Sequence, residues 1–413
     1  MVVRKGICTT RALIPALISL VFLSGCACKG LITKHYDESL YRVVNLLPDR
    51  QIGENQHFLV YSDCQAGWRA YEAFLRGKNW TDRKMFIVPF YQLYLLGNGI
   101  AGGINYLFHR PDYGGRERRM MRNAIYAAAK RWGAAFIMNV GDICSSDGRR
   151  PAHWKIFLRE NRVEHPLLNE IPYLPVLGNH EYANDTVYGF PNYEAIFGYP
   201  RFYTVESDDV ILLVLNSSYL IDQFQYIDDE AQDRLFEEWF VSPAGGEPSW
   251  LERELEHSRK PFKIVVMHHP PITFAMHYRD WHRPAYGRDL LVKRKALLEL
   301  FATHGVQVVF SGHDHSYQHN VLRLSNGGVI HFLIGGGAGA PLREGIDIEK
   351  RERYRREMLN EGLEVTQVQS GSFYHYFAVE VRDGILNIKT VEVTGDDDNP
   401  LRTVETLSFD SGR

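Results

Sequence analysis

Short apolar runs alternate with amphipathic segments along most of the chain, a pattern that predicts strands alternating with helices. The predicted strands cover residues 57–63, 134–142, 172–181, 208–218, 262–271 and 306–315. The predicted helices cover residues 116–132, 248–258 and 293–305. A further apolar run occupies residues 328–342. The alternation indicates an α/β fold.

A β-hairpin is predicted near the end of the chain, over residues 375–393. Two segments of alternating apolar and polar residues flank the pair Asp383-Gly384. Both residue types tolerate the positive φ angles that a two-residue hairpin turn requires.

Five of the predicted strands end in a short polar cluster. The clusters are Ser62-Asp63, Gly141-Asp142, Gly178-Asn179-His180-Glu181, His268-His269 and Gly312-His313-Asp314-His315. Because ligands bind at the carboxyl ends of strands in open α/β sheets, we expect these clusters to meet at one site. His313 and His315 lie two positions apart, so in extended chain their imidazoles face the same side, an arrangement that suits a metal.

Taken in order, the clusters resemble the sequence blocks of the calcineurin-like metallophosphoesterases, which run D-x-H, G-D, G-N-H-[DE], an apolar strand ending in H, and G-H-x-H. The corresponding stretches are "SDCQ", "GDIC", "GNHE", "VVMHHPP" and "SGHDH". The resemblance covers residues 55–395, and 248–271 with 311–319 are most similar to the purple-acid-phosphatase-like branch. It implies a four-layer α/β/β/α sandwich of two mixed sheets flanked by helices.

The resemblance also implies two divalent metal ions and hydrolysis of a phosphate ester by a hydroxide that both metals activate. The implied ligands of the first metal are Asp63, Gln65, Asp142 and His315, and those of the second are Asp142, Asn179, His268 and His313. A shared carboxylate holds two cations about 3.5–4 Å apart, where they can clamp a phosphate. Manganese, iron and zinc all suit these donors. His180 is expected to act as an acid or as an electrostatic stabiliser.

Gln65 and Ser145 depart from the family patterns. Gln65 stands where the family commonly has His; its amide oxygen can still bind a metal and favours manganese or iron slightly. Ser145 stands where purple acid phosphatases have Tyr, so the iron–tyrosinate chemistry is not implied. A zinc protease is excluded, because the HExxH motif beginning at His180 would need His at the position of Asn184.

Several side chains near these clusters leave alternatives open. His269 and His319 follow predicted ligands, and we expect them to pack or hydrogen-bond rather than bind metal. Cys64 and Cys144 could form a disulfide or remain two small buried thiols. In residues 274–289, the basic side chains could contact substrate or belong to a solvated loop; they are His277, Arg279, His282 and Arg288.

The first 25 residues resemble a bacterial lipoprotein signal. Arg4 and Lys5 precede an apolar run that is short for a membrane span and ends in "LSGC", which resembles a lipobox with Cys26 as the lipidated residue. An uncleaved signal anchor is the alternative. We therefore expect export to a bacterial cell envelope, a tether over residues 26–55, and a metallophosphoesterase domain over 56–410 with an insertion at about 68–115.

Residues 85–108 form an uncharged stretch of 24 residues inside the expected insertion. Its length would suit a membrane span, but a single crossing would separate Asp63 from Asp142. Pro89 and the glycines of 97–103 favour a broken hairpin instead. It could contact the bilayer surface beside the lipid anchor, or pack against protein as a cap, a substrate wall or a dimer contact.

The overall composition is that of a globular protein of 413 residues with a formal net charge of −3. This mildly acidic balance gives no reason to expect a nucleic-acid partner. Monoester and diester substrates both remain open. The alternative of a different class is a lipoprotein that keeps the fold as a non-catalytic binding module, which fits less well because position 65 alone departs among the expected ligands.

Overall fold

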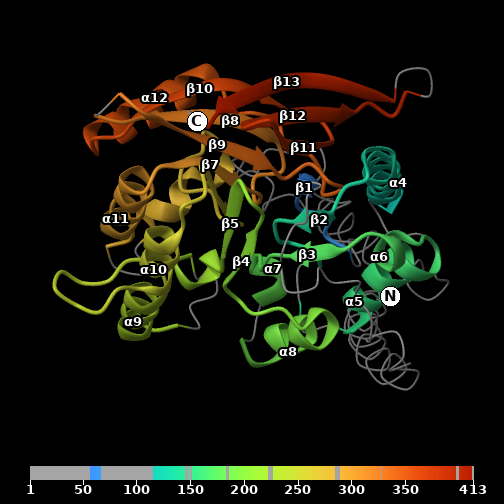
Figure 1. Ribbon diagram of the computed structural model, residues 1–413, viewed down its shortest axis with the longest axis horizontal. Helices are drawn as coiled ribbons and strands as arrows, with labels where there is room; N and C mark the ends of the chain where they lie inside the picture. Colours follow the sequence, from blue (N-terminus) through green and yellow to red (C-terminus); the bar gives the residue numbers. More distant parts are fainter. Residues whose placement is uncertain are drawn as a thin grey trace, which may run out of the picture. The chain divides into compact units, whose positions relative to one another are not determined.

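The computed structural model describes residues 56–66, 115–144, 148, 151–182, 186–221, 227–283, 289–325, 327–396 and 400–411 (Figure 1). The chain divides into two units, one of Met1–Arg42 with Ala70–Arg110 and one of Val43–Arg69 with Pro111–Arg413, and every described residue belongs to the second. The predictions for residues 1–25, Cys26, the tether, the stretch 85–108 and Ser145 lie outside the described residues. Among the helices described, none has the length and apolarity to cross a membrane.

The first sheet has six strands in the order β13-β12-β11-β1-β2-β3. Its strands are β1 (His57–Tyr61), β2 (Phe136–Asn139), β3 (Tyr173–Pro175), β11 (His375–Arg382), β12 (Ile385–Val393) and β13 (Leu401–Asp410). The strands β1, β2 and β3 are parallel neighbours, and the other pairings are antiparallel. The carboxyl ends of β1, β2 and β3 therefore lie at one edge of this sheet.

The second sheet has seven strands in the order β10-β8-β9-β7-β6-β5-β4. Its strands are β4 (Tyr203–Glu206), β5 (Val210–Leu215), β6 (Phe262–Met267), β7 (Val306–Ser311), β8 (Tyr317–Arg323), β9 (Val329–Gly335) and β10 (Glu364–Gly371). The strands β5, β6, β7 and β9 run parallel to one another, and β4, β8 and β10 pair antiparallel. The second sheet is therefore mixed, like the first.

The two sheets pack against each other through buried aromatic and aliphatic side chains. Phe310 of β7 and Phe377 of β11 are fully buried, with ring centroids 5.2 Å apart. At the end of β9, a Cβ on Gly335 would lie 2.5 Å from the Phe377 ring, so the absence of a side chain allows this close approach. This packing confirms the predicted sandwich of two mixed sheets flanked by helices.

The three predicted helices are present with ends within three residues of those expected. They are α4 (Gly115–Trp132), α10 (Trp250–His257) and α11 (Leu290–Thr303). The helix α4 buries Met121, Ile125 and Ala128, which share one face at helical spacing. Ser249 and Glu252 form a capping box at the start of α10. The other α-helices in the described part of the chain are α5 (Pro151–Leu158), α6 (Leu167–Glu170), α7 (Asn179–Tyr182), α8 (Thr186–Phe197), α9 (Asp229–Trp239) and α12 (Ile348–Asn360).

The predicted hairpin is confirmed as β11 and β12. Asp383 and Gly384 have φ angles of 52° and 73°, as a type I′ turn requires. The strand β13, which pairs with β12 at the edge of the sheet, was not predicted, because its mostly exposed residues show too little apolar character.

Candidate metal centre

The polar ends of five strands meet between the two sheets, as the sequence predicts. Three come from the neighbouring parallel strands β1, β2 and β3, and two come from the neighbouring parallel strands β6 and β7. The residues predicted as metal ligands are all buried; they are Asp63, Gln65, Asp142, Asn179, His268, His313 and His315. Strand adjacency therefore places residues more than 200 positions apart in one cluster.

Asp142 lies between two groups of candidate ligands. Its Oδ2 is 3.1 Å from Gln65 Nε2 and 3.4 Å from His180 Nε2. Its Oδ1 is 3.2 Å from His268 Nε2 and accepts a hydrogen bond from the backbone N–H of His180 at 3.0 Å. One carboxylate thus faces donors from both sheets.

Asp63, Asp142 and His315 form the first group, each with one candidate ligand atom within 4.8 Å of the others. Asp63 Oδ1 is buried, accepts no hydrogen bond from the described residues, and lies 3.4 Å from His315 Nε2. His315 Nδ1 is 3.0 Å from the carbonyl oxygen of Pro341, so Nδ1–H can donate there and leave the lone pair on Nε2.

Gln65 completes the first group. As placed, its Nε2 lies 3.0 Å from His315 Nε2 and donates to Asp142 Oδ2. Rotating the side-chain amide by 180° would exchange Oε1 and Nε2, and the oxygen would then face His315 and Asp142. The oxygens of Gln65 and Asp142 and the nitrogen of His315 would then face one another, an arrangement that fits a cation.

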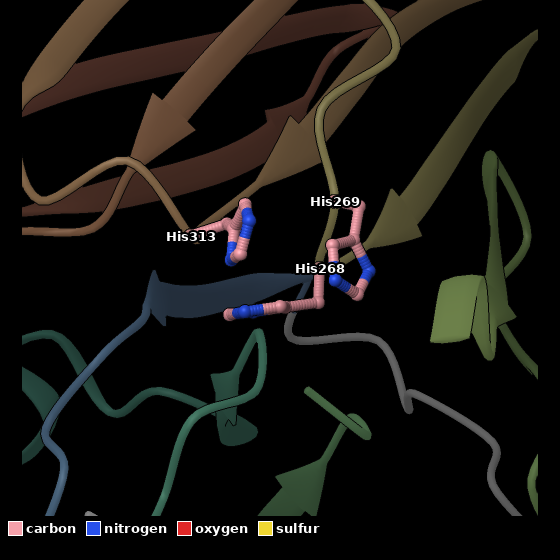
Figure 2. Close-up of side chains that lie close together, drawn as sticks. All are labelled: His268, His269 and His313. Carbon is pink, nitrogen blue, oxygen red and sulfur yellow. The ribbon is translucent and has the colours of Figure 1, made fainter. Parts of the chain in front are cut away.

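His268 and His313 each have one ring nitrogen beside a fixed oxygen, to which its N–H can donate, so that the other nitrogen could bind a cation. His268 Nδ1 lies 2.7 Å from the carbonyl oxygen of Val140, and its Nε2 lies 3.1 Å from Asn179 Oδ1. His313 Nε2 lies 3.1 Å from Asp280 Oδ2, which assigns its lone pair to Nδ1. Figure 2 shows the rings of His268 and His313 close together, with His269 beside them. The donor set of this second group also fits a cation.

The charges of the cluster act on one another strongly. Burial raises the pKa of Asp63 to about 6, with the charge of His268 opposing this shift and the charge of Asp142 adding to it. Burial also opposes ionisation of Asp142, but the positive charges of His180 and His268 hold its pKa well below the ordinary value. Two carboxylates buried side by side need positive charge nearby, which a cation would supply.

Four of the candidate ligands have left-handed backbone. Asp63, Gln65, Asp142 and His313 have φ angles of 60°, 45°, 53° and 69°. They are four of the six such non-glycine residues in the described part of the chain, and each costs about 1–3 kcal/mol. The hydrogen bond from His313 N–H to Asp63 Oδ2, at 2.9 Å, helps to hold them. Strain is therefore concentrated at the site, as is typical of functional residues.

Gly312 allows two loops to come into contact. A Cβ at this position would overlap the Ser62 side chain and lie 2.5 Å from Asp63 Oδ2. Glycine is therefore needed, because the backbone after β7 lies directly against the side chains of Ser62 and Asp63 after β1.

Glu181 has a structural role that the sequence did not indicate. Its buried carboxylate accepts backbone hydrogen bonds from Asp142 and Gly178 at Oε2 (2.9 and 2.8 Å) and from Cys144 at Oε1 (2.9 Å). Burial and the charge of Asp142 raise its pKa to about 7 against these hydrogen bonds. The acid at the end of "GNHE" thus ties the loops after β2 and β3 together.

Within the segment 274–289, the described basic side chains divide between the site and ion pairs outside it. The His277 ring lies 3.7 Å from the His313 ring by centroids, and His277 Nδ1 is 2.7 Å from Asp280 Oδ2. Asp280, which the sequence did not single out, therefore contacts both histidines. By contrast, Arg279 pairs with Glu357 and His282 with Glu361. Arg288 lies outside the described residues.

The remaining open alternatives concern His319 and two cysteines. His319 hydrogen-bonds Glu405 and His331 at 2.9 Å each and, as predicted, is not part of the cluster. Cys64 and Cys144 lie on neighbouring segments but are not joined by a disulfide. Burial raises the pKa of Cys64 to about 12, so its thiol is protonated and packs in the interior.

Residues 57–317 match the family model of the calcineurin-like phosphoesterases, and this match spans the five strand ends described above. The chain belongs to that family. The predicted membership is therefore confirmed, and with it a metal-dependent phosphatase type of enzyme.

Proteins similar in sequence to this chain include acid phosphatases. Mouse tartrate-resistant acid phosphatase type 5 is 26% identical to this phosphoesterase over 294 residues, which cover 67% of this chain and 81% of the mouse protein. The human protein of the same name is 24% identical over 294 residues, covering 67% of this chain and 82% of the human one.

Solved structures share the fold. Purple acid phosphatase PPD1 from yellow lupin (Lupinus luteus) seeds has a TM-score of 0.54 and 13% identity, over 87% of this chain and 54% of the lupin chain. This phosphoesterase thus spans about half the lupin enzyme. GAP50, the anchor in the inner membrane complex of Plasmodium, has a TM-score of 0.50 and 12% identity, over 86% of this chain and 89% of GAP50.

Proposed function

We propose that this phosphoesterase hydrolyses phosphate esters at a centre that holds two divalent cations. The observation that carries the proposal is the position of Asp142, whose Oδ2 faces Gln65 while its Oδ1 faces His268. A carboxylate with one oxygen toward each group of donors is suited to bridge two cations.

The ligands follow from the two groups. The first cation would be held by Asp63, Gln65, Asp142 and His315, and the second by Asp142, Asn179, His268 and His313. Carbonyl oxygens and imidazoles suit manganese, iron and zinc, so the donor types leave all three as candidates. When bound, the cations would neutralise charge on the phosphoryl oxygens and lower the pKa of the attacking water.

We propose that His180 acts on the leaving group of the substrate. Its backbone N–H is fixed on Asp142 Oδ1, and its imidazole, 23% exposed, lies 3.4 Å from Asp142 Oδ2. A protonated His180 beside this carboxylate can donate to the departing oxygen or to a phosphoryl oxygen. The hydrogen bond from the His180 backbone N–H fixes the position of this residue, so the imidazole would be held in an orientation suited to proton donation.

We propose phosphate monoesters rather than diesters as the substrate class, because the related proteins include acid phosphatases. Nitrophenol release from mono- and bis-nitrophenyl phosphate, with each metal added in turn, distinguishes the two. A panel of nucleotides, sugar phosphates, phospholipid head groups and phosphoproteins then narrows the class.

The bridging role is tested by Asp142→Asn, which keeps the size of the side chain and removes its charge. We expect loss of divalent metal, measured by elemental analysis, together with loss of hydrolysis. The matched control is Asp228→Asn at the start of α9, where Asn caps a helix as well as Asp does. Two bound metals and full activity in Asp142→Asn would refute the proposed centre.

We also propose that the protein is exported and lipidated on Cys26, on the basis of the "LSGC" motif. Expression in bacteria with a labelled fatty acid tests this directly. Cys26→Ser should abolish labelling, whereas Cys28→Ser should leave it intact. Equal labelling of Cys26→Ser and the natural sequence would exclude the lipobox.

A further inference from the structure

His269 lies in a cluster with two of the proposed ligands. His268, His269 and His313 each offer a ring nitrogen, and these nitrogens lie within 4.8 Å of one another. The His269 ring is 5.1 Å from that of His268 and 4.5 Å from that of His313, between centroids. Figure 2 shows the three rings near one another, with one nitrogen of His269 on the side of the other two rings.

The two nitrogens of the His269 ring have different surroundings. Nδ1 lies 2.9 Å from Ser217 Oγ, and the same oxygen accepts a hydrogen bond from the His269 backbone N–H at 3.0 Å. Nε2 is buried and has no hydrogen-bond partner among the described residues. His269 as a whole is 1% exposed. A buried ring nitrogen without a hydrogen-bond partner is unfavourable, and a cation bound at this nitrogen would remove that cost.

We infer that His269 Nε2 binds the second cation together with His268 and His313, an inference that rests on the proposed two-cation centre. If Nδ1–H donates to Ser217 Oγ, the lone pair is on Nε2. Ligand histidines usually donate their other N–H to an oxygen in this way, which fixes both tautomer and ring orientation. Ser217 is thus a positioning residue for His269.

The additional imidazole changes the chemistry of the second position. Three imidazoles would face it, whereas the first position is surrounded mainly by oxygen donors from Asp63, Gln65 and Asp142. Imidazole favours zinc over manganese relative to oxygen donors. His269 therefore strengthens zinc selectivity at the second position, a role that the sequence motif did not assign to it.

The test is to titrate metal-free protein with zinc, comparing the natural sequence with His269→Phe, which keeps a ring of similar size. We expect one of the two zinc equivalents to bind about 100-fold more weakly or worse, because loss of a partner behind a ligand already costs 10–100-fold. Cobalt substitution should show altered visible absorption for the affected ion. Ser217→Ala should weaken the same equivalent to a smaller extent.

The control is His331→Phe, which removes a half-buried imidazole of β9 outside the cluster and should leave both zinc affinities unchanged. Two native affinities and an unchanged cobalt spectrum in His269→Phe would overturn the inference while leaving the two-cation centre intact. Failure of the natural protein to bind two metals would overturn the proposed function itself, and this inference with it. If His269→Phe does not fold, X-ray absorption spectroscopy of the natural protein with two zinc ions bound provides the test. We expect four imidazole ligands in total over the two ions, and a total of three would contradict the inference.

Discussion

Glu181 Oε2 accepts a hydrogen bond from the backbone N–H of Asp142 at 2.9 Å, although the two residues follow different strands. The same carboxylate also binds the backbone N–H groups of Gly178 and Cys144. Glu181 is not one of the proposed ligands, yet it fixes the left-handed turn that orients Asp142 toward both groups of donors.

Glu181→Ala should destabilise the protein by about 3 kcal/mol, because it leaves three buried N–H groups without an acceptor. Chemical denaturation measures the free energy of unfolding, and metal binding should weaken as the turn at Asp142 relaxes. The matched control is Glu256→Ala on the exposed side of α10, expected to change stability by less than about 0.5 kcal/mol. Equal effects of the two substitutions would contradict the anchoring role.

His180→Ala should lower turnover by roughly 10²–10⁴-fold, the range for a positioned acid or base. Metal content should not change, because Asp142 is contacted by the His180 backbone N–H, which alanine retains. Steady-state kinetics with elemental analysis provides the measurement. Normal turnover would remove His180 from the mechanism, whereas loss of metal would make it a ligand or a support for one.

Gln65 is tested by two substitutions with different expected outcomes. Gln65→His restores the residue common in the family and should keep two metals, with preference moving from manganese toward zinc. Gln65→Ala should weaken the first cation and spare the second. Metal stoichiometry and activity in manganese and zinc distinguish these results. Native affinity for two metals in Gln65→Ala would show that Gln65 is not a ligand.

His375 makes stability depend on pH. Burial lowers its pKa from 6.5 to about 4, so between these values the unfolded chain binds a proton that the folded protein does not. Stability should therefore fall as pH decreases from 6.5 toward 4, by about 3 kcal/mol in total from this residue. His375→Phe fits among the rings of Tyr317 and Phe377 and should remove this part of the dependence. Unfolding free energies at pH 7.5 and 5.0 test it, and equal losses in both proteins would contradict the assignment.

The alternation of apolar runs and polar ends was enough to predict the α/β class, the hairpin at Asp383-Gly384 and the convergence of five polar strand ends on one site. These features are local or repeat at a regular spacing, so sequence alone carries them. Asp63, Asp142 and His315 could be named as ligands because the motifs that contain them resemble those of the calcineurin-like metallophosphoesterases.

The tertiary structure decided what depends on neighbours distant in the chain. Which sheet supplies each ligand follows from strand order, and no local pattern encodes that order. Glu181, Asp280 and His269 have roles only because folding brings their side chains against Asp142 and His313 from other loops. The edge strand β13 was likewise missed, because pairing with β12 and not its own apolar content makes it a strand.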